Sequence, residues 1–168
     1  MRCLVVYSSV TGNTKALAEA VCEVMPPGTE LFPVWNAPPP DAYDFLALGF
    51  WVYRAAPDPR MRRYMATVNG KTAALFGTLA AYPDSDHARK VIVNAGAMLG
   101  ASRIAGTFLC QGKLAPKRLE ARLNGTGKGH PMTPERRARL LEAEKHPNEH
   151  DFAMAREAFA RFLQDAAI

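Results

Sequence analysis

The fold is decided by one stretch near the amino terminus, LVVYSSVTGNTK at residues 4–15. Its unbroken apolar start predicts a strand that is covered on both faces of a sheet. The polar turn that follows leads into a helical pattern in which Leu17, Ala20, Val21 and Val24 share one face. A buried strand, a short turn and an amphipathic helix in this order are typical of the opening unit of a parallel α/β domain.

Hydroxyl side chains gather around one glycine in this turn. A helix start offers unpaired N–H groups to an anion, and glycine lets the backbone come close to a ligand. We therefore interpret the turn as a phosphate site rather than an ordinary helix cap. It has neither the GxxxxGK[ST] nor the GxGxxG pattern, which excludes a Walker loop and a dinucleotide fingerprint. The predicted binding residues here are Ser8, Ser9, Val10, Thr11, Gly12, Asn13 and Thr14.

Further apolar runs and helical patterns alternate along the rest of the chain. The predicted strands lie at 4–7, 30–34, 45–50, 72–76 and 104–110. The predicted helices follow the opening turn and lie at 60–68, 85–101, 116–123, 134–145 and 148–166. This alternation predicts right-handed βαβ units, a five-stranded parallel sheet and helices on both of its faces. Ligands of such sheets bind at the carboxyl ends of the strands, near the point where the strand order reverses.

Two stretches after predicted strands, 51–59 and 77–83, are expected to be loops at that edge, and both carry aromatic side chains. A flat ring ligand accounts for large aromatic side chains on loops, and the alternative is that they cover the core. Either Trp51 or Tyr53 from one loop and Tyr82 from the other are the candidates to stack on such a ring. The predicted binding residues here are Phe50, Trp51, Val52, Tyr53, Arg54, Gly77, Thr78, Leu79 and Tyr82.

The basic excess of the chain sits in one segment. The formal net charge is +5, and residues 112–146 hold nine basic and four acidic side chains. The segment interrupts the strand–helix alternation before the last helix, so we expect a helical insertion there. It could dock an acidic partner, attract a carboxylate-bearing substrate, or be a solvated basic face.

The turn at residues 8–14 resembles the [ST]-x-T-G-x-T phosphate loop of the flavodoxin family. The alternation of strands and helices and the two aromatic loops are similar to the same family over most of the chain. The segment after Gly112, with His130-Pro131-Met132 and His146-Pro147, resembles the subgroup that includes the accessory flavoprotein of bacterial bilirubin reduction. The resemblance implies a single flavodoxin-like domain over 1–168, a three-layer sandwich with strand order 2-1-3-4-5, and bound FMN.

FMN implies electron transfer, with the protein positioning the flavin and tuning its potential. A carrier that passes electrons to a redox partner protein, docked on 112–146, is favoured over an enzyme. The alternatives are an FMN-dependent reductase or quinone reductase that acts on a small substrate, and a module for a different phosphate ligand. Arg54 at the flavin edge would stabilise reduced anionic flavin and make its potential less negative; a solvated arginine face is the alternative.

Several classes are excluded by composition and motif. Hydrophobic residues make up 48% of the 168 residues and charged residues 22%, which is a globular composition. No apolar run is long enough for a membrane span, and the amino terminus predicts a strand rather than a signal peptide. We therefore expect a cytoplasmic protein whose three cysteines are buried as small apolar groups. No nucleic-acid motif accompanies the basic charge, and HPNEH at 146–150 is a weak zinc pattern without a third ligand.

Overall fold

Five parallel strands form the central sheet in the order β2-β1-β3-β5-β6. The computed structural model describes residues 1–166. Its parallel strands are β1 (Cys3–Tyr7), β2 (Glu30–Pro33), β3 (Phe45–Tyr53), β5 (Thr72–Leu79) and β6 (Arg103–Gln111). A two-residue strand, β4 (Ala56–Pro57), pairs antiparallel with the end of β3. The predicted order 2-1-3-4-5 is confirmed, because β4 only adds a short hairpin beside the five parallel strands.

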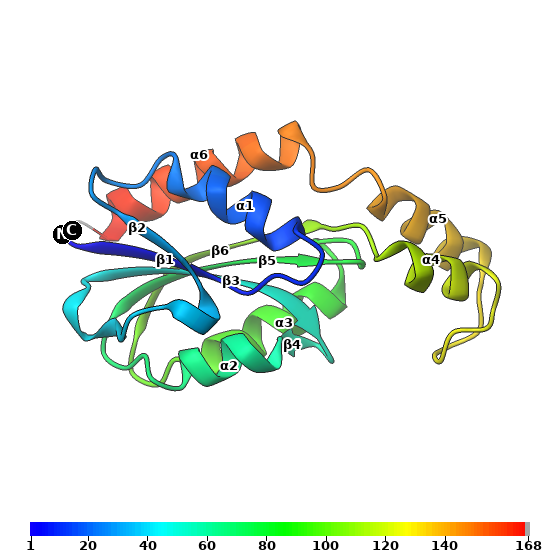
Figure 1. Cartoon of the computed structure of the whole chain (residues 1–168), viewed down its shortest axis with the longest axis horizontal. Coiled ribbons are helices and arrows are strands. Elements are labelled where there is room, and N and C mark those ends of the chain that lie inside the picture. Colours follow the sequence, from blue (N-terminus) through cyan, green and yellow to red (C-terminus); the bar gives the residue numbers. More distant parts are fainter. Residues whose placement is uncertain (167–168) are drawn as a thin grey trace.

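Helices cover both faces of the sheet, so the predicted three layers are confirmed (Figure 1). On one face lie α1 (Asn13–Cys22) and α6 (Glu149–Ala166), which share an apolar cluster with alternate residues of the strands. On the other face lie α2 (Pro59–Met65) and α3 (Asp86–Ala97), with their own cluster. Short 3-10 turns, η1 (Val34–Asn36) and η2 (Pro40–Ala42), join β2 to β3.

The two apolar clusters explain why the unbroken apolar runs form strands. Every residue of β1 is buried, with successive side chains entering opposite clusters. Phe159 of α6 is fully buried and packs edge-on against Phe76 of β5, with ring centroids 5.7 Å apart. Cys3 and Cys110 are also buried, and burial raises the pKa of both thiols. These two cysteines therefore serve as small apolar core groups, as expected, whereas Cys22 is only partly buried.

Two stretches expected as loops are strands instead. Trp51 to Tyr53 continue β3, and Gly77 to Leu79 continue β5. The register pairs Phe50 with Gly77 and Trp51 with Thr78, and β6 pairs with the same end of β5. Backbone pairing with neighbouring strands on both sides therefore extends β5 beyond its apolar run. The aromatic and β-branched residues of 51–53 also favour a strand.

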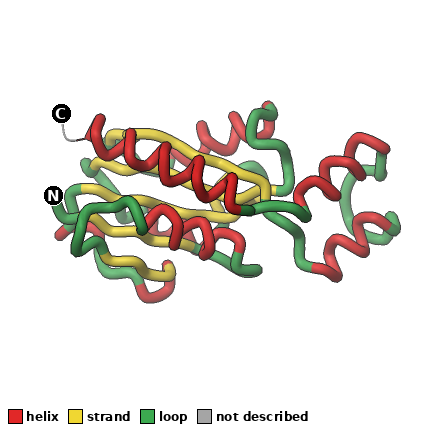
Figure 2. Tube along the Cα trace, turned by 90° about the horizontal axis from the view of Figure 1, so that it is seen from above, coloured by secondary structure: helices red, strands yellow, loops and turns green. Residues whose placement is uncertain are grey.

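The helical insertion before the last helix is confirmed. It contains α4 (Pro116–Leu123) and α5 (Pro134–Ala143), which follow β6 and precede α6. Figures 1 and 2 show both helices standing beyond the carboxyl ends of the strands, outside the three layers. The insertion thus lies at the edge where ligands of parallel sheets bind. Within the described residues, none of the helices combines the length and the apolar character needed to cross a membrane.

Candidate functional site

The turn after β1 presents unpaired donors to the carboxyl edge of the sheet. Gly12 has a φ of 94°, a left-handed conformation that suits glycine, and it immediately precedes α1. Its N–H donates to Ser9 Oγ at 3.1 Å. Among residues 1–166, no side chain caps the start of α1. The first N–H groups of the helix thus stay available for an anion.

Buried polar contacts fix the turn from below. Thr14 Oγ1 lies 2.9 Å from Thr78 Oγ1, which joins the first turn of α1 to β5. Ser8 Oγ donates to Asp58 Oδ1 at 2.8 Å, and the same oxygen accepts the N–H groups of Arg60 and Met61 at the start of α2. The second carboxylate oxygen of Asp58, Oδ2, is buried without a partner among the described residues. The turn is therefore held between two strands and a second helix.

A cavity of about 930 Å³ opens above this turn. Its size is near the upper end of ligand pockets, which range over roughly 300–1,000 Å³. It brings together ten of the predicted binding residues from three separate parts of the chain. They are Ser9, Val10, Thr11, Asn13, Thr14, Trp51, Val52, Thr78, Leu79 and Tyr82.

Four of the other predicted residues, Ser8, Gly12, Phe50 and Gly77, lie in the scaffold behind the cavity. Ser8 is buried beneath the turn, and Gly12 shapes its backbone. Phe50 is buried in the core on the side of α2 and α3. Its ring occupies the space that a Cβ on Gly77 would need. These residues position the walls of the cavity without lining it.

Tyr53 and Arg54 also lie outside the lining. Tyr53 packs edge-on against Trp51, with ring centroids 5.8 Å apart. The guanidinium carbon of exposed Arg54 lies 5.3 Å from the centre of the Tyr53 ring. Of the two candidates on this strand, Trp51 is therefore the aromatic side chain that faces the cavity. The position of Arg54 agrees with the solvated-face alternative.

The insertion supplies a second wall of the cavity, for which no binding residue was predicted. Apolar and basic side chains of α5 and of the segments around α4 line the cavity there. Gly125, Gly127 and Gly129 of the glycine-rich loop also contribute to the lining. The signal in the sequence was the basic charge of 112–146, which follows directly on the carboxyl end of β6. The lining residues from the insertion include Lys113, Leu114, Arg118, Arg122, Met132, Arg136, Arg139 and Leu140.

Side-chain amides tie the insertion to the sheet edge. Asn13 Nδ2 donates to the carbonyl oxygen of Lys113 at 2.8 Å. Buried Gln111 donates through Nε2 to the carbonyl oxygens of Ala80 at 3.1 Å and Arg139 at 3.4 Å. The phosphate turn, the end of β5 and α5 are thus joined by two amide side chains.

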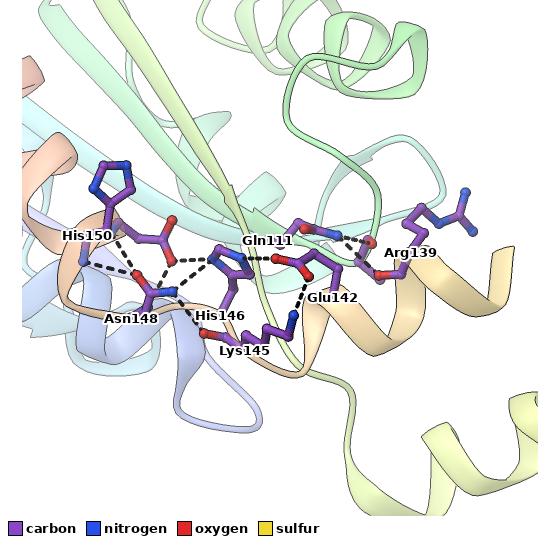
Figure 3. A network of polar contacts seen from close by, with 9 residues as sticks. Gln111, Arg139, Glu142, Lys145, His146, Asn148 and His150 are labelled. Atoms are coloured by element: carbon purple, nitrogen blue, oxygen red, sulfur yellow. Dashed lines mark hydrogen bonds and ion pairs between the residues drawn. The ribbon is translucent and has the colours of Figure 1, made fainter. Parts of the chain in front are cut away.

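His146 joins α5 to the start of α6 (Figure 3). Its Nδ1 lies 2.6 Å from Asp151 Oδ2, and its Nε2 lies 3.3 Å from Glu142 Oε1. Burial disfavours the charged ring, but the hydrogen bonds to Asp151 and Glu142 outweigh this and raise the pKa of His146. Asn148, not His146, accepts the N–H groups of the first turn of α6 through its side-chain oxygen.

His146, which belongs to the weak zinc pattern, instead uses both ring nitrogens in contacts with the carboxylates of Asp151 and Glu142. Within residues 1–166, no group of three His, Cys, Asp or Glu side chains is arranged to hold a metal ion. The network is therefore a structural joint between the insertion and the domain.

A doubly wound parallel sheet with a ligand cavity at its carboxyl edge places the chain among the α/β nucleotide-binding proteins. The flavodoxin domain family matches residues 4–160. The chain belongs to the flavodoxin family, so the predicted family is confirmed. The finer resemblance to one subgroup stays a prediction.

Known proteins are similar to this chain in sequence or in fold. The flavodoxin-like domain-containing protein BilS of Clostridioides difficile (strain CD3) is 29% identical over 159 residues, which cover 90% of both chains. A solved flavodoxin from the domain Archaea superposes over 100% of both chains with a TM-score of 0.59 and 15% identity. A flavoprotein from Lactobacillus acidophilus NCFM, solved in complex with FMN, matches with a TM-score of 0.52 and 13% identity. That match covers 64% of this chain and 92% of the other.

Proposed function

We propose that this chain binds FMN at the carboxyl edge of its sheet and passes electrons to a redox partner protein. The observation that carries the proposal is a single cavity in which the uncapped start of α1 meets Trp51 and Tyr82. Membership of the flavodoxin family and the fold shared with solved flavodoxins support it.

The donor set fits the phosphate of FMN. Hydroxyl groups of Ser9, Thr11 and Thr14 and the first N–H groups of α1 all belong to the cavity or its rim. Such donors bind a phosphate through charge-assisted hydrogen bonds and the helix dipole. Asn13 also lines the cavity, and its side-chain amide holds the insertion.

The aromatic side chains fit a planar ring. Trp51 is half-buried, and Tyr82 is 41% exposed although it is a large aromatic residue. Flat rings stack on such side chains with a gain beyond burial alone. FMN, when bound, supplies the redox chemistry, and these residues would orient it and shield it from water.

The size of the cavity favours a second candidate, a reductase that acts directly on a small molecule beside the flavin. Such an enzyme needs room next to the ring, and the wall from the insertion encloses additional space there. A carrier instead needs an exposed flavin edge and a docking surface for its partner.

The test is an absorbance spectrum of the purified protein, repeated after addition of FMN and then of each reductant. Flavin bands shifted from those of free FMN are expected. Bleaching by dithionite but not by NADPH would support the carrier, and direct bleaching by NADPH would support the reductase. The absence of bound flavin even with excess FMN would overturn both and leave a module for another phosphate ligand.

A matched pair of substitutions locates the flavin. Thr14→Val removes a hydroxyl at the start of α1 and is expected to weaken FMN binding by about tenfold, since a hydrogen bond to a charged group contributes about 1.5–3 kcal/mol. Thr67→Val, at an exposed position in the turn after α2, removes a hydroxyl that only contacts a local carbonyl and should leave the affinity unchanged. Equal affinities for both variants would contradict the site.

A further inference from the structure

The wall that the insertion gives to the cavity carries one sign of charge. The cationic side chains that line the cavity come from 113–139, and no Asp or Glu is among the lining residues. They are Lys113, Arg118, Arg122, Arg136 and Arg139. Because like charges in a partly enclosed space repel one another, this wall is stabilised when an anion enters the cavity.

These cations have no carboxylate partner within the part of the chain that the structure describes. None of the five takes part in an ion pair there. Arg139 Nε is buried and lacks a hydrogen-bond acceptor among the same residues. Figure 3 shows the side chain of Arg139 directed away from the Glu142–His146 network. A buried donor without an acceptor costs free energy, which a ligand oxygen would recover.

The remaining charges of the insertion lie elsewhere. Four basic side chains, Lys117, Lys128, Arg137 and Lys145, are exposed and do not line the cavity. The four acidic side chains of 112–146 also lie off the cavity, and Glu142 pairs with Lys145 and His146. The unbalanced positive charge of the insertion thus lies along the cavity, where Lys113 and Arg118 are also exposed to solvent. This arrangement favours a small anion over an acidic protein surface.

Apolar side chains complete the same wall. Leu114, Met132 and Leu140 line the cavity beside the arginines, and Ala80 and Ala81 face them from the end of β5. A highly polar nucleotide would leave these groups without a partner. An organic acid with an apolar body would contact them while its carboxylate meets the guanidinium groups.

We propose that the insertion and the end of β5 form a binding site for a small organic carboxylate with an apolar body. None of the residues named for this site holds the flavin in the proposal above. The site therefore goes beyond FMN binding and can be tested separately from it.

The experiment is equilibrium dialysis of the FMN-loaded protein against 1-pyrenebutyrate, with neutral 1-pyrenebutanol as the matched probe. We expect the acid to bind about tenfold tighter than the alcohol, because a charge-assisted contact contributes at least about 1.4 kcal/mol. Binding of the acid, but not of the alcohol, should weaken as the salt concentration rises. Equal binding of the two probes would show an apolar pocket only and overturn the proposal.

Substitutions on each helix separate the cavity from the outer surface. Arg139→Gln and Arg122→Gln are each expected to weaken 1-pyrenebutyrate binding about tenfold. The matched controls Arg137→Gln on α5 and Lys117→Gln on α4 should leave it within about twofold, because both side chains lie off the cavity. If the control variants lose as much affinity for 1-pyrenebutyrate as the cavity variants do, the probe binds to the general positive surface. Such a surface is the kind that docks acidic proteins. That result would overturn the proposal.

Two further readouts keep the outcomes distinct. Arg139→Lys keeps the charge and should retain binding better than Arg139→Gln, provided that all variants bind FMN as the unchanged protein does. If the unchanged protein does not bind FMN, the proposed flavin function is contradicted. The carboxylate site would still be supported if binding of 1-pyrenebutyrate requires Arg122 and Arg139. Binding of NADPH through these arginines without binding of 1-pyrenebutyrate would overturn the proposed ligand class.

Discussion

The cavity has one wall from the sheet and one from the insertion, and the two walls differ in what holds them. The sheet wall rests on strands and helices whose apolar side chains are fully buried on both faces. In the insertion, α4 has no buried residue and α5 has only Leu140 and Ala143. Apolar burial therefore fixes the flavin side of the site, whereas a few polar anchors fix the anion side.

The largest expected effect tests the apolar half of this contrast. Phe159→Ala should lower the free energy of unfolding by about 3–5 kcal/mol, because it opens a cavity beside Phe76. Leu141→Ala on α5 is the matched control, since Leu141 is 44% exposed, and it should change the value by less than about 0.5 kcal/mol. Urea denaturation followed by circular dichroism measures both. Similar losses for the two variants would mean that the insertion is part of the apolar core.

A pair of glycines gives the next effect. A Cβ on Gly49 of β3 would overlap the ring of Phe76, so Gly49→Ala should cost about 1–3 kcal/mol of stability through overpacking. A Cβ on Gly127 in the insertion would meet its nearest atoms at 3.5 Å, an ordinary contact. Gly127→Ala should therefore be within about 0.5 kcal/mol of the unchanged protein. Thermal unfolding of both variants measures the two losses of stability. A larger loss for Gly127→Ala than for Gly49→Ala would contradict the contrast between the tightly packed sheet and the loosely packed insertion.

A smaller effect is expected at the polar anchors. Gln111→Ala removes the amide that joins Ala80 and Arg139, and it should cost about 1 kcal/mol. The loss should be local, with faster hydrogen exchange over 134–143 and unchanged exchange in β1 and β3. Hydrogen–deuterium exchange by mass spectrometry resolves these segments. Uniform acceleration across the sheet would show that Gln111 serves the core instead.

The smallest effect is a pH dependence of the joint at His146. The pKa of His146 is raised in the folded state, so its contribution to stability is present below about pH 6.5 and is lost as the pH rises through the raised value. The difference in unfolding free energy between the unchanged protein and His146→Gln should shrink from pH 6 to pH 9. An NMR titration that places the pKa of His146 below 6.5 would contradict this assignment.

Much of the sheet wall could be predicted because its information is local. The hydroxyl groups around Gly12 and the apolar runs that become strands each lie within a few consecutive residues. The ends of β3 and β5 could not be predicted in this way. Residues 51–53 and 77–79 become strand because they pair with segments that are distant in the sequence. The local sequence of each segment predicts a loop, because it contains no information about the strands that pair with it.

In the insertion, local sequence predicts the first helix but not which side chains line the cavity. Its first helix begins at Pro116 and ends at Leu123, as predicted, since proline suits the first turn of a helix. Which of its cations face the cavity depends on the contacts of Asn13 with Lys113 and of Gln111 with Arg139. These contacts join residues 100 and 28 positions apart, so no local pattern announces them.

The two ends of the insertion meet at one place. The N–H of Lys113 donates to the carbonyl oxygen of His146 at 2.9 Å, and the N–H of Leu114 donates to Glu144 Oε1 at 3.1 Å. The insertion is thus a closed loop whose two ends lie next to each other on the domain. Halving the length of such a loop changes the entropic free energy of closing it by only about 0.6 kcal/mol. The insertion can therefore be shortened at little entropic cost while the order of the strands beneath it stays the same.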